Sequence, residues 1–330
     1  MPVHLAMLLD KIRRSILILL FVFSASLWAS MRVAGAVDIA DEASLLTFPI
    51  NLTDDRGRNT HLDHFAKRII SLSPHITELV FAAGAGDKLV GVSRYSDYPA
   101  AATAITDVGD SSSLDLERII ALQPDLVIAW RSGNASTDIE KLEKLGITVF
   151  VTEASRLEDV PRLLRATGKL AGTLTRAGLA AKTYEEELQR IKLNYGGRHK
   201  ISVFPLIWHQ PLMTVNGNHV ISDIIDICGG VNIFASAPSL TPVISAENLL
   251  EADPQAVISS VSLEFAETGT KRMLRGFPDL SAVRNNHLFF VHPDLLHRQT
   301  VRMLQAAKTV CAKLESVRSG QGRNVFQQGI

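Results

Sequence analysis

Residues 114–128 read LDLERIIALQPDLVI, and residues 244–258 read ISAENLLEADPQAVI. The two stretches match at an offset of 130 residues throughout, which pairs Glu117 with Glu247 and Pro124 with Pro254. Each copy has a helical pattern before the proline and an apolar strand after it. Such a repeat predicts two related lobes in this chain of 330 residues. The alternative is chance similarity between two helix–Pro–strand units.

Strand and helix patterns alternate around both copies. The expected strands lie at 69–72, 89–93, 125–130, 148–153, 201–208, 256–261 and 287–293. The expected helices lie at 74–84, 114–122, 138–146 and 219–230, with a last helix starting near His297. Ser73 and Pro74 are suited to the N-cap and first position of the first helix. Regular alternation of this kind predicts an α/β fold with parallel sheets and covering helices.

A helix-compatible segment separates the two halves. It covers residues 156–197, with Gly168, Gly172 and Gly178 as weak points, and we expect a rigid connector rather than a flexible linker. We therefore predict two Rossmann-like lobes joined by a single long connecting helix. The N-terminal lobe is assigned to 68–155 and the C-terminal lobe to 198–330.

Two further segments precede the first lobe. The apolar run at 15–30 follows basic residues, and the A-x-A pattern Ala34-Gly35-Ala36 comes after it. The run is shorter than the roughly 20 residues of a membrane span. Residues 1–36 are therefore predicted to be a cleaved secretory signal peptide, with an uncleaved anchor as the alternative. Residues 37–67 are predicted to be an extension that contains a hairpin turning at 54–57.

The composition argues against nucleic acid as a partner and against catalysis. Lys plus Arg and Asp plus Glu both number 34, so no net basic charge favours nucleic acid. The motifs G-x-S-x-G, H-E-x-x-H, G-x-G-x-x-G and the P-loop are absent from the sequence. We expect no catalytic residues, with an exported hydrolase as the alternative from another class. The ten histidines are scattered, and no metal site is predicted.

The chain has two cysteines, Cys228 and Cys311. An even number in an exported protein predicts a disulfide, and two buried free thiols are the alternative. The bridge would tie the last helix to the second half.

Each copy of the repeat places a glutamate near the start of its helix. Leu116, Ile119 and Ile120 form an apolar stripe at helical spacing, and Glu117 lies off that stripe. A helix N-terminus favours a carboxylate by about 0.3–1 kcal/mol, which is sufficient reason for either glutamate alone. The matched pair, Glu117 and Glu247, suggests two acidic contacts for a partner with two-fold symmetry.

A polar, aromatic stretch, SRYSDYP at 93–99, follows the second expected strand. Ser, Asp and Pro favour a simple turn. The alternative is a ligand-facing loop, because α/β sheets bind ligands beyond the carboxyl ends of their strands.

Four segments carry a resemblance to a known family: SLSPHITELVFAAG, GVSRYSDYP, LERIIALQPDLVIAWRSGNA and ICGGVNIF. The chain resembles substrate-binding proteins of ABC importers, and within them the periplasmic cobalamin-binding proteins, over residues 68 to 316. The resemblance implies a monomer in the periplasm that carries a corrinoid as transported ligand, without a cofactor. Its partners would be the membrane-spanning and ATPase subunits of an importer. Glu117 and Glu247 would dock into arginine pockets there, and Cys228 would pair with Cys311.

The resemblance also implies a set of ligand-binding residues. Tyr95, Trp130 and the stretch Asp294, Leu295, Leu296, His297 and Arg298 fall on ligand-contacting positions, and Tyr98, His75 and Trp208 are further candidates. His75 could instead be a polar cap residue, Trp208 part of a strand-end cluster, and Arg298 a partner of Asp294. Some aromatic positions of the family are replaced, by serines at 111–113 and by Leu240-Thr241-Pro242. A ferric siderophore or haem is therefore the alternative ligand.

Overall fold

The computed structural model describes residues 48–261 and 269–320. The signal peptide predicted for residues 1–36 lies outside the described residues. Among the helices of this described part, none is both long and apolar enough to cross a membrane.

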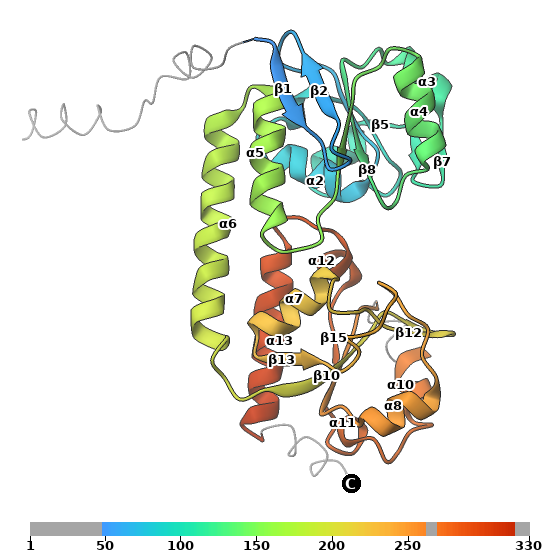
Figure 1. Cartoon of the computed structure of the whole chain (residues 1–330), viewed down its shortest axis with the longest axis vertical. Coiled ribbons are helices and arrows are strands. Elements are labelled where there is room, and N and C mark those ends of the chain that lie inside the picture. Colours follow the sequence, from blue (N-terminus) through green and yellow to red (C-terminus); the bar gives the residue numbers. More distant parts are fainter. Residues whose placement is uncertain (1–47, 262–268, 321–330) are drawn as a thin grey trace, which may run out of the picture. The chain divides into compact units, whose positions relative to one another are not determined.

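The N-terminal lobe is built on a five-stranded sheet with the order β5-β4-β3-β8-β9 (Figure 1). Its strands are β3 (Ile69–Ser71), β4 (Leu89–Val92), β5 (Thr106–Asp107), β8 (Leu126–Trp130) and β9 (Val149–Thr152). All of its pairings are parallel. The helices of this lobe are α2 (Pro74–Ala82), α3 (Leu116–Ala121) and α4 (Ser136–Lys144), with 3-10 turns at Gly86–Lys88 and Ala100–Ala104. Apolar side chains of this parallel sheet contribute to two hydrophobic clusters.

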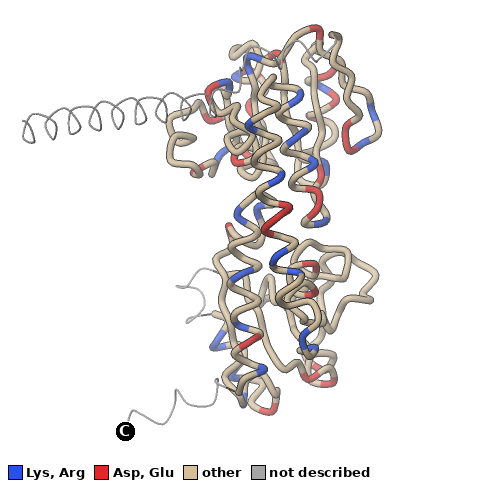
Figure 2. Tube along the Cα trace, turned by 90° about the vertical axis from the view of Figure 1, so that its left-hand side faces the viewer, with Lys and Arg blue, Asp and Glu red and all other residues tan. Residues whose placement is uncertain are grey.

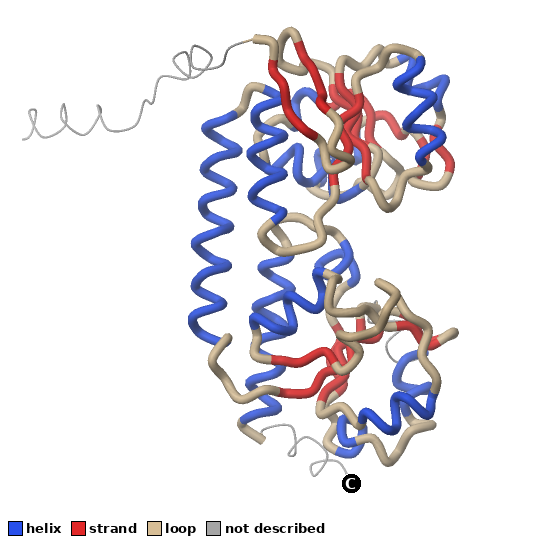
Figure 3. Tube along the Cα trace, in the orientation of Figure 1, coloured by secondary structure: helices blue, strands red, loops and turns tan. Residues whose placement is uncertain are grey.

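The C-terminal lobe repeats this plan with a four-stranded parallel sheet of order β13-β10-β14-β15 (Figure 3). Its strands are β10 (Ile201–Leu206), β13 (Gly230–Asn232), β14 (Ala256–Ser259) and β15 (Leu288–Phe290). Its helices are α7 (Val220–Ile227), α8 (Ala246–Ala252), α10 (Lys271–Leu274), α11 (Ser281–Arg284), α12 (Pro293–His297) and α13 (Met303–Arg318). The predicted α/β class is confirmed.

Within the described residues, three antiparallel strand pairs accompany the two parallel sheets. They are β1 (Ile50–Thr53) with β2 (Asn59–Leu62), β6 (Gly109–Asp110) with β7 (Ser113–Leu114), and β11 (Trp208–His209) with β12 (Leu212–Met213). The first pair confirms the predicted hairpin at 54–57, where Gly57 N donates to Asp54 O. The side chain of Asp54 accepts from the backbone of Arg56 and Arg58, which closes the turn.

The helical segment predicted over 156–197 contains two helices, α5 (Asp159–Ala171) and α6 (Leu174–Tyr195). Gly172, one of the expected weak points, ends α5 in the left-handed conformation with φ 70°. A side chain there would also collide with the Phe65 ring, 2.6 Å from the added Cβ. The single long connecting helix is therefore α6, which packs beside α5 (Figure 1).

One hydrophobic cluster runs through both lobes. It contains Leu79 of α2, Leu164 of α5, Leu188 of α6, Ile224 of α7 and Val310 of α13. Charged residues of both signs are interspersed along the chain (Figure 2).

The disulfide between Cys228 and Cys311 is confirmed, with the two Cα atoms 4.6 Å apart. It joins the end of α7 to α13. The last helix does not begin near His297 as predicted. Instead α12 ends there, and α13 begins at Met303. The backbone at Arg298 is extended, with φ −97° and ψ 108°, and it directs the chain out of the helix.

The sequence repeat corresponds to a structural repeat. Asp115 caps α3 by accepting from Arg118 N at 2.9 Å, and Ser245 caps α8 by accepting from Asn248 N at 3.2 Å. Each unit then reaches its proline through a residue with left-handed backbone, φ 46° at Gln123 and 35° at Asp253. The strands that follow, β8 and β14, each pair in parallel with the first strand of their lobe.

Candidate ligand-binding and docking sites

The loop at 93–99 is a tight turn held down by buried hydroxyl groups. The Oγ of Ser96 lies 2.9 Å from Thr77 Oγ1 and 3.3 Å from Ser93 Oγ. Thr77 Oγ1 in turn lies 2.6 Å from Ser71 Oγ at the end of β3. Tyr95 adopts left-handed backbone with φ 69°, and the residue is 70% exposed. The turn predicted from the sequence is confirmed, and it presents the Tyr95 ring to solvent.

His75 and Trp130 meet at the carboxyl ends of β3 and β8. Their rings are in edge contact, with centroids 5.0 Å apart. Ser73 occupies the predicted N-cap position of α2, but its side chain does not cap the helix, and its Oγ instead lies 2.7 Å from His75 Nδ1. Burial, and secondly the charge of Arg298, lower the pKa of His75 to about 3. The imidazole is therefore neutral, and it packs against the Trp130 ring.

The position of Trp130 depends on two residues of the turn that follows β8, Gly133 and Asn134. Asn134 Oδ1 accepts from Trp130 N at 2.7 Å, and Asn134 Nδ2 donates to Leu72 O at 3.0 Å, which ties β8 to the end of β3. Gly133 lies against the indole, so that an added Cβ would be 1.8 Å from Trp130 Cε3. The half-buried indole donates through Nε1 to Glu153 Oε1 at 3.4 Å.

In the C-terminal lobe the candidate residues fall into two places. Trp208 lies on the β11–β12 hairpin with 48% exposure, and its Nε1 donates to Gln210 O at 2.8 Å. Leu295 and Leu296 lie on α12, where Leu295 is half-buried but Leu296 is only 1% exposed and packs in the core. The ligand contact predicted for Leu296 is therefore corrected to a core position. His297 is exposed, with Nε2 2.7 Å from Ser260 Oγ.

Arg298 is engaged with acidic side chains of both lobes. Its Nη2 lies 3.2 Å from Asp294 Oδ1, which confirms the internal pair considered from the sequence. Its Nη1 also reaches Glu78 of α2 at 3.1 Å, although 220 residues separate the two. Arg302 binds the same carboxylate through Nε at 2.9 Å and Nη2 at 2.5 Å. Glu78, only 3% exposed, is thus neutralised by two arginines.

Glu117 and Glu247 occupy equivalent, exposed positions two residues after the N-caps of α3 and α8. Within residues 48–261 and 269–320, neither carboxylate forms an ion pair. Glu247 accepts from its own backbone N–H and from the Ser245 hydroxyl, which lowers its pKa and keeps it charged. Both groups are therefore available to a cationic partner.

An exposed apolar residue accompanies each of these glutamates, and one of them, Ile120, belongs to the apolar stripe that the sequence pattern indicated. Ile120 and Leu250 lie three residues after Glu117 and Glu247, and each is 45% exposed. Ile119 and Leu249, one position earlier, are the fully buried members of the two helices. The two lobes therefore present the same surface pattern, in which an exposed carboxylate is followed three residues later by an exposed apolar side chain.

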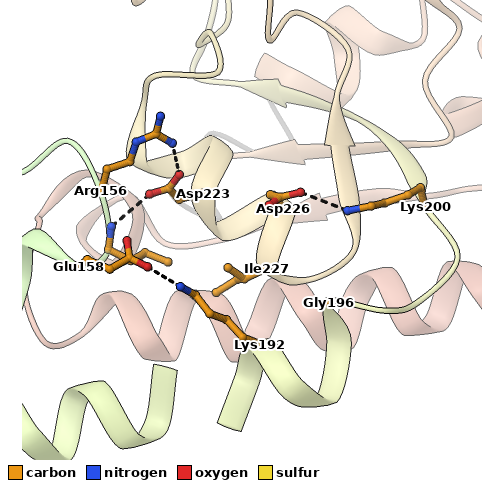
Figure 4. A pocket seen from close by; sticks show the side chains of 9 residues that line it. Arg156, Glu158, Lys192, Gly196, Lys200, Asp223, Asp226 and Ile227 are labelled. Atoms are coloured by element: carbon orange, nitrogen blue, oxygen red, sulfur yellow. Dashed lines mark hydrogen bonds and ion pairs between the residues drawn. The ribbon is translucent and has the colours of Figure 1, made fainter. Parts of the chain in front are cut away.

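A charged pocket of about 550 Å³ lies between the start of α5, the end of α6 and α7 (Figure 4). Its six charges form three ion pairs: Arg156–Asp223, Lys192–Glu158 and Lys200–Asp226. Since each of these charges already has a partner of opposite sign, the pocket offers no group to recognise an ionic ligand. In the described part of the chain, no group of three or more His, Cys, Asp or Glu side chains is placed to hold a metal ion.

This chain of two parallel-sheet lobes joined by α6 resembles known proteins in sequence and in fold. The profile described as periplasmic binding protein matches residues 69–295. The chain belongs to the periplasmic binding protein family. It is 36% identical over 252 residues to the vitamin B12-binding protein of Vibrio parahaemolyticus, an alignment that covers 76% of this chain and 90% of that protein.

Solved structures share this fold. The crystal structure of the periplasmic vitamin B12 binding protein BtuF of Vibrio cholerae matches with a TM-score of 0.71 and 35% identity, covering 77% of this chain and 98% of that one. The periplasmic heme-binding protein RhuT from Roseiflexus sp. RS-1 matches with a TM-score of 0.67 at 22% identity, covering 76% and 99%. The second likeness concerns the fold alone.

Proposed function

We propose that this protein captures a corrinoid, cobalamin, in the periplasm and delivers it to an ABC importer. The observation that carries the proposal is the 36% identity to a vitamin B12-binding protein over 90% of that protein's length. The protein performs no chemistry on its ligand. It acts as a monomer, after removal of the signal peptide that we propose for residues 1–36.

The ligand is held by aromatic and apolar side chains at the ends of the strands. Tyr95 is exposed on its loop, Trp130 is half-buried between His75 and Gly133, and Trp208 is exposed on the second lobe. A large planar ring system is recognised by such surfaces and by apolar area rather than by charge. Leu295, half-buried on α12, adds apolar area.

Docking uses the two repeated helices. Glu117 and Glu247 are exposed carboxylates at matched positions of α3 and α8, and neither forms an ion pair within the part of the chain that the structure describes. We assign them to basic sites on the two membrane-spanning subunits, with the ATPase subunits beneath. Ile120 and Leu250 add an apolar contact beside each carboxylate.

A haem or ferric siderophore is the second candidate ligand. It is favoured by the polar β6–β7 turn, where Ser111, Ser112 and Ser113 replace an aromatic position of the family that the sequence resembles. Fewer aromatic faces leave less surface for the corrin plane.

Calorimetric titration of residues 37–330 separates these ligands. We expect cyanocobalamin to bind with sub-micromolar Kd, and haemin and a ferric hydroxamate siderophore to bind more weakly. Absence of cobalamin binding with clear binding of another chelate would move the ligand to that class.

Transport in cells tests the docking assignment. Glu117→Ala combined with Glu247→Ala should abolish uptake while leaving the Kd for ligand unchanged. Glu140→Ala with Glu186→Ala, which removes two exposed carboxylates elsewhere, is the matched control and should transport normally. Normal uptake by the E117A/E247A protein would refute the docking assignment.

A further inference from the structure

Arg298 also binds the loop that carries Tyr95. Its Nη1 donates to Asp97 Oδ1 at 2.6 Å, and its Nη2 approaches Tyr95 O at 3.4 Å. The loop belongs to the N-terminal lobe, whereas Arg298 follows α12 in the C-terminal lobe. The contact therefore crosses between segments that are about two hundred residues apart in the sequence.

The guanidinium of Arg298 already forms ion pairs within the protein, which leaves few of its N–H groups to bind a ligand. Its side chain lies close to three carboxylates, those of Glu78, Asp97 and Asp294. With Arg302, the group holds three acidic and two basic side chains, so no excess positive charge remains to attract an anionic part of a ligand. The side chain is also largely covered. These contacts favour a role in holding structure over direct recognition of the ligand.

The loop requires such support. Left-handed backbone is uncommon for a residue other than glycine and persists where the surroundings hold it. At Tyr95 the inner side of the turn is held by the hydroxyl of Ser96, and the outer side by Arg298. Arg302 adds a contact from the same segment, because its guanidinium lies over the Tyr98 ring at 4.2 Å.

We propose that Arg298 is a positioning residue, which fixes the loop 95–98 from the opposite lobe and thereby sets the position of the Tyr95 ring for the ligand. The proposal rests on the proposed function for the role of Tyr95. The contact of Arg298 with Asp97 and Tyr95 O, called the tie below, is present in the ligand-free protein. Its loss changes the position of Tyr95 even though Arg298 makes no contact with the ligand.

Two single variants and their combination test the proposal. Asp97→Asn removes the charged partner on the loop, where the Asp97 side chain is exposed, and it leaves the pairs of Glu78 intact. Arg298→Gln removes the tie from the other side. Because the released loop must be ordered again when the ligand binds, each variant should weaken cyanocobalamin binding several-fold. Because both variants break one tie, the double variant should bind no more weakly than R298Q.

Hydrogen exchange without ligand provides a second measurement. The amides of residues 94–98 should exchange faster in D97N and R298Q than in the wild type. Arg165→Gln is the matched control, because Arg165 forms a bidentate pair with Glu185 between α5 and α6, away from the loop. It should leave both the Kd and the exchange of residues 94–98 unchanged.

The outcomes separate the possible roles of Arg298. If R298Q lost affinity while D97N kept both wild-type affinity and wild-type exchange, Arg298 would be a direct ligand contact and the proposal would be overturned. If the wild type bound no cobalamin, the proposed function would fail, and exchange at 94–98 alone would then support or refute the tie. Should R298Q fail to fold, the affinity and hydrogen exchange of D97N still test the proposal, because a substitution at the exposed Asp97 side chain should not prevent folding.

Discussion

Gly133 lies so close to Trp130 that a methyl group on its Cα would meet the indole at 1.8 Å. The absence of a side chain at 133 is thus what allows the ring to lie at the end of β8, in edge contact with His75. A substitution at this glycine acts on the ligand site without altering any group proposed to touch the ligand.

Gly133→Ala should displace Trp130 and weaken ligand binding, with a loss of about 1–3 kcal/mol in the free energy of unfolding from overpacking. A shifted emission maximum in a Trp208→Phe background reports the movement of Trp130. Gly178→Ala is the control, since nothing lies within 4 Å of an added Cβ there and α6 should be unharmed. Unchanged emission and affinity in G133A would show that the indole has room to adapt.

Glu78→Gln should destabilise the protein strongly. The carboxylate is buried and holds Arg298 and Arg302, so neutralising it leaves two largely covered cations without their shared partner. Breaking a buried pair in this way costs about 3–5 kcal/mol. Urea unfolding measures the effect, and Glu186→Gln on the exposed face of α6 should change the same free energy by less than about 1 kcal/mol. A loss below 1 kcal/mol in E78Q would mean that water or rearrangement satisfies the arginines.

The free energy of unfolding should fall on acidification because of His75. Its pKa is about 3 in the folded protein, owing first to burial and secondly to Arg298. In the unfolded chain the pKa is about 6.5. Between these two pKa values only the unfolded state binds the proton. The stability that neutral His75 contributes to the folded state is therefore fully present above pH 6.5 and is lost as the pH falls toward 3. From pH 7 to pH 5 the loss amounts to about 2 kcal/mol.

Unfolding of His75→Asn at the two pH values isolates this contribution. The wild type should lose about 2 kcal/mol more than H75N between pH 7 and pH 5. His61→Gln, at an exposed histidine of β2, should keep the wild-type difference. Equal pH dependence in wild type and H75N would show that other groups dominate acid unfolding.

Removal of the disulfide by Cys228→Ala with Cys311→Ala should lower the free energy of unfolding by about 2–4 kcal/mol, given the sequence separation of 83 residues between the cysteines. Both cysteines are fully buried, which adds packing losses to the chain-entropy term. Urea unfolding of the variant, beside wild type with and without reductant, provides the measurement. A variant as stable as the oxidised wild type would refute a stabilising role.

Ile120→Ser with Leu250→Ser should reduce uptake several-fold while leaving the Kd for ligand unchanged, because both side chains are exposed beside the docking glutamates. Leu179→Ser with Leu193→Ser removes two exposed apolar residues of α6 and is the control, which should transport normally. Equal uptake by both double variants would restrict docking to the carboxylates.

The sequence predicted what local patterns determine. The strand and helix alternation, the hairpin at 54–57 and the equivalent positions of Glu117 and Glu247 all follow from periodicity, turn residues and the repeat. Contacts across long separations do not leave such a pattern. Nothing near Glu78 in the sequence indicates Arg298 or Arg302, and Leu296 differs from its neighbour Leu295 only in the direction of its side chain. Ile120 likewise fits a helical stripe, but it is 45% exposed, whereas its neighbour Ile119 is fully buried.

The continuous cluster through α2, α5, α6, α7 and α13 has a consequence for cooperativity. Leu79 and Leu164 from the first lobe share one core with Ile224 and Val310 from the second, so neither lobe can melt while the other keeps its full packing. Calorimetric heating should show a single transition rather than one for each lobe. A fragment ending before α6 would lack most of the members of that core and should aggregate rather than fold alone.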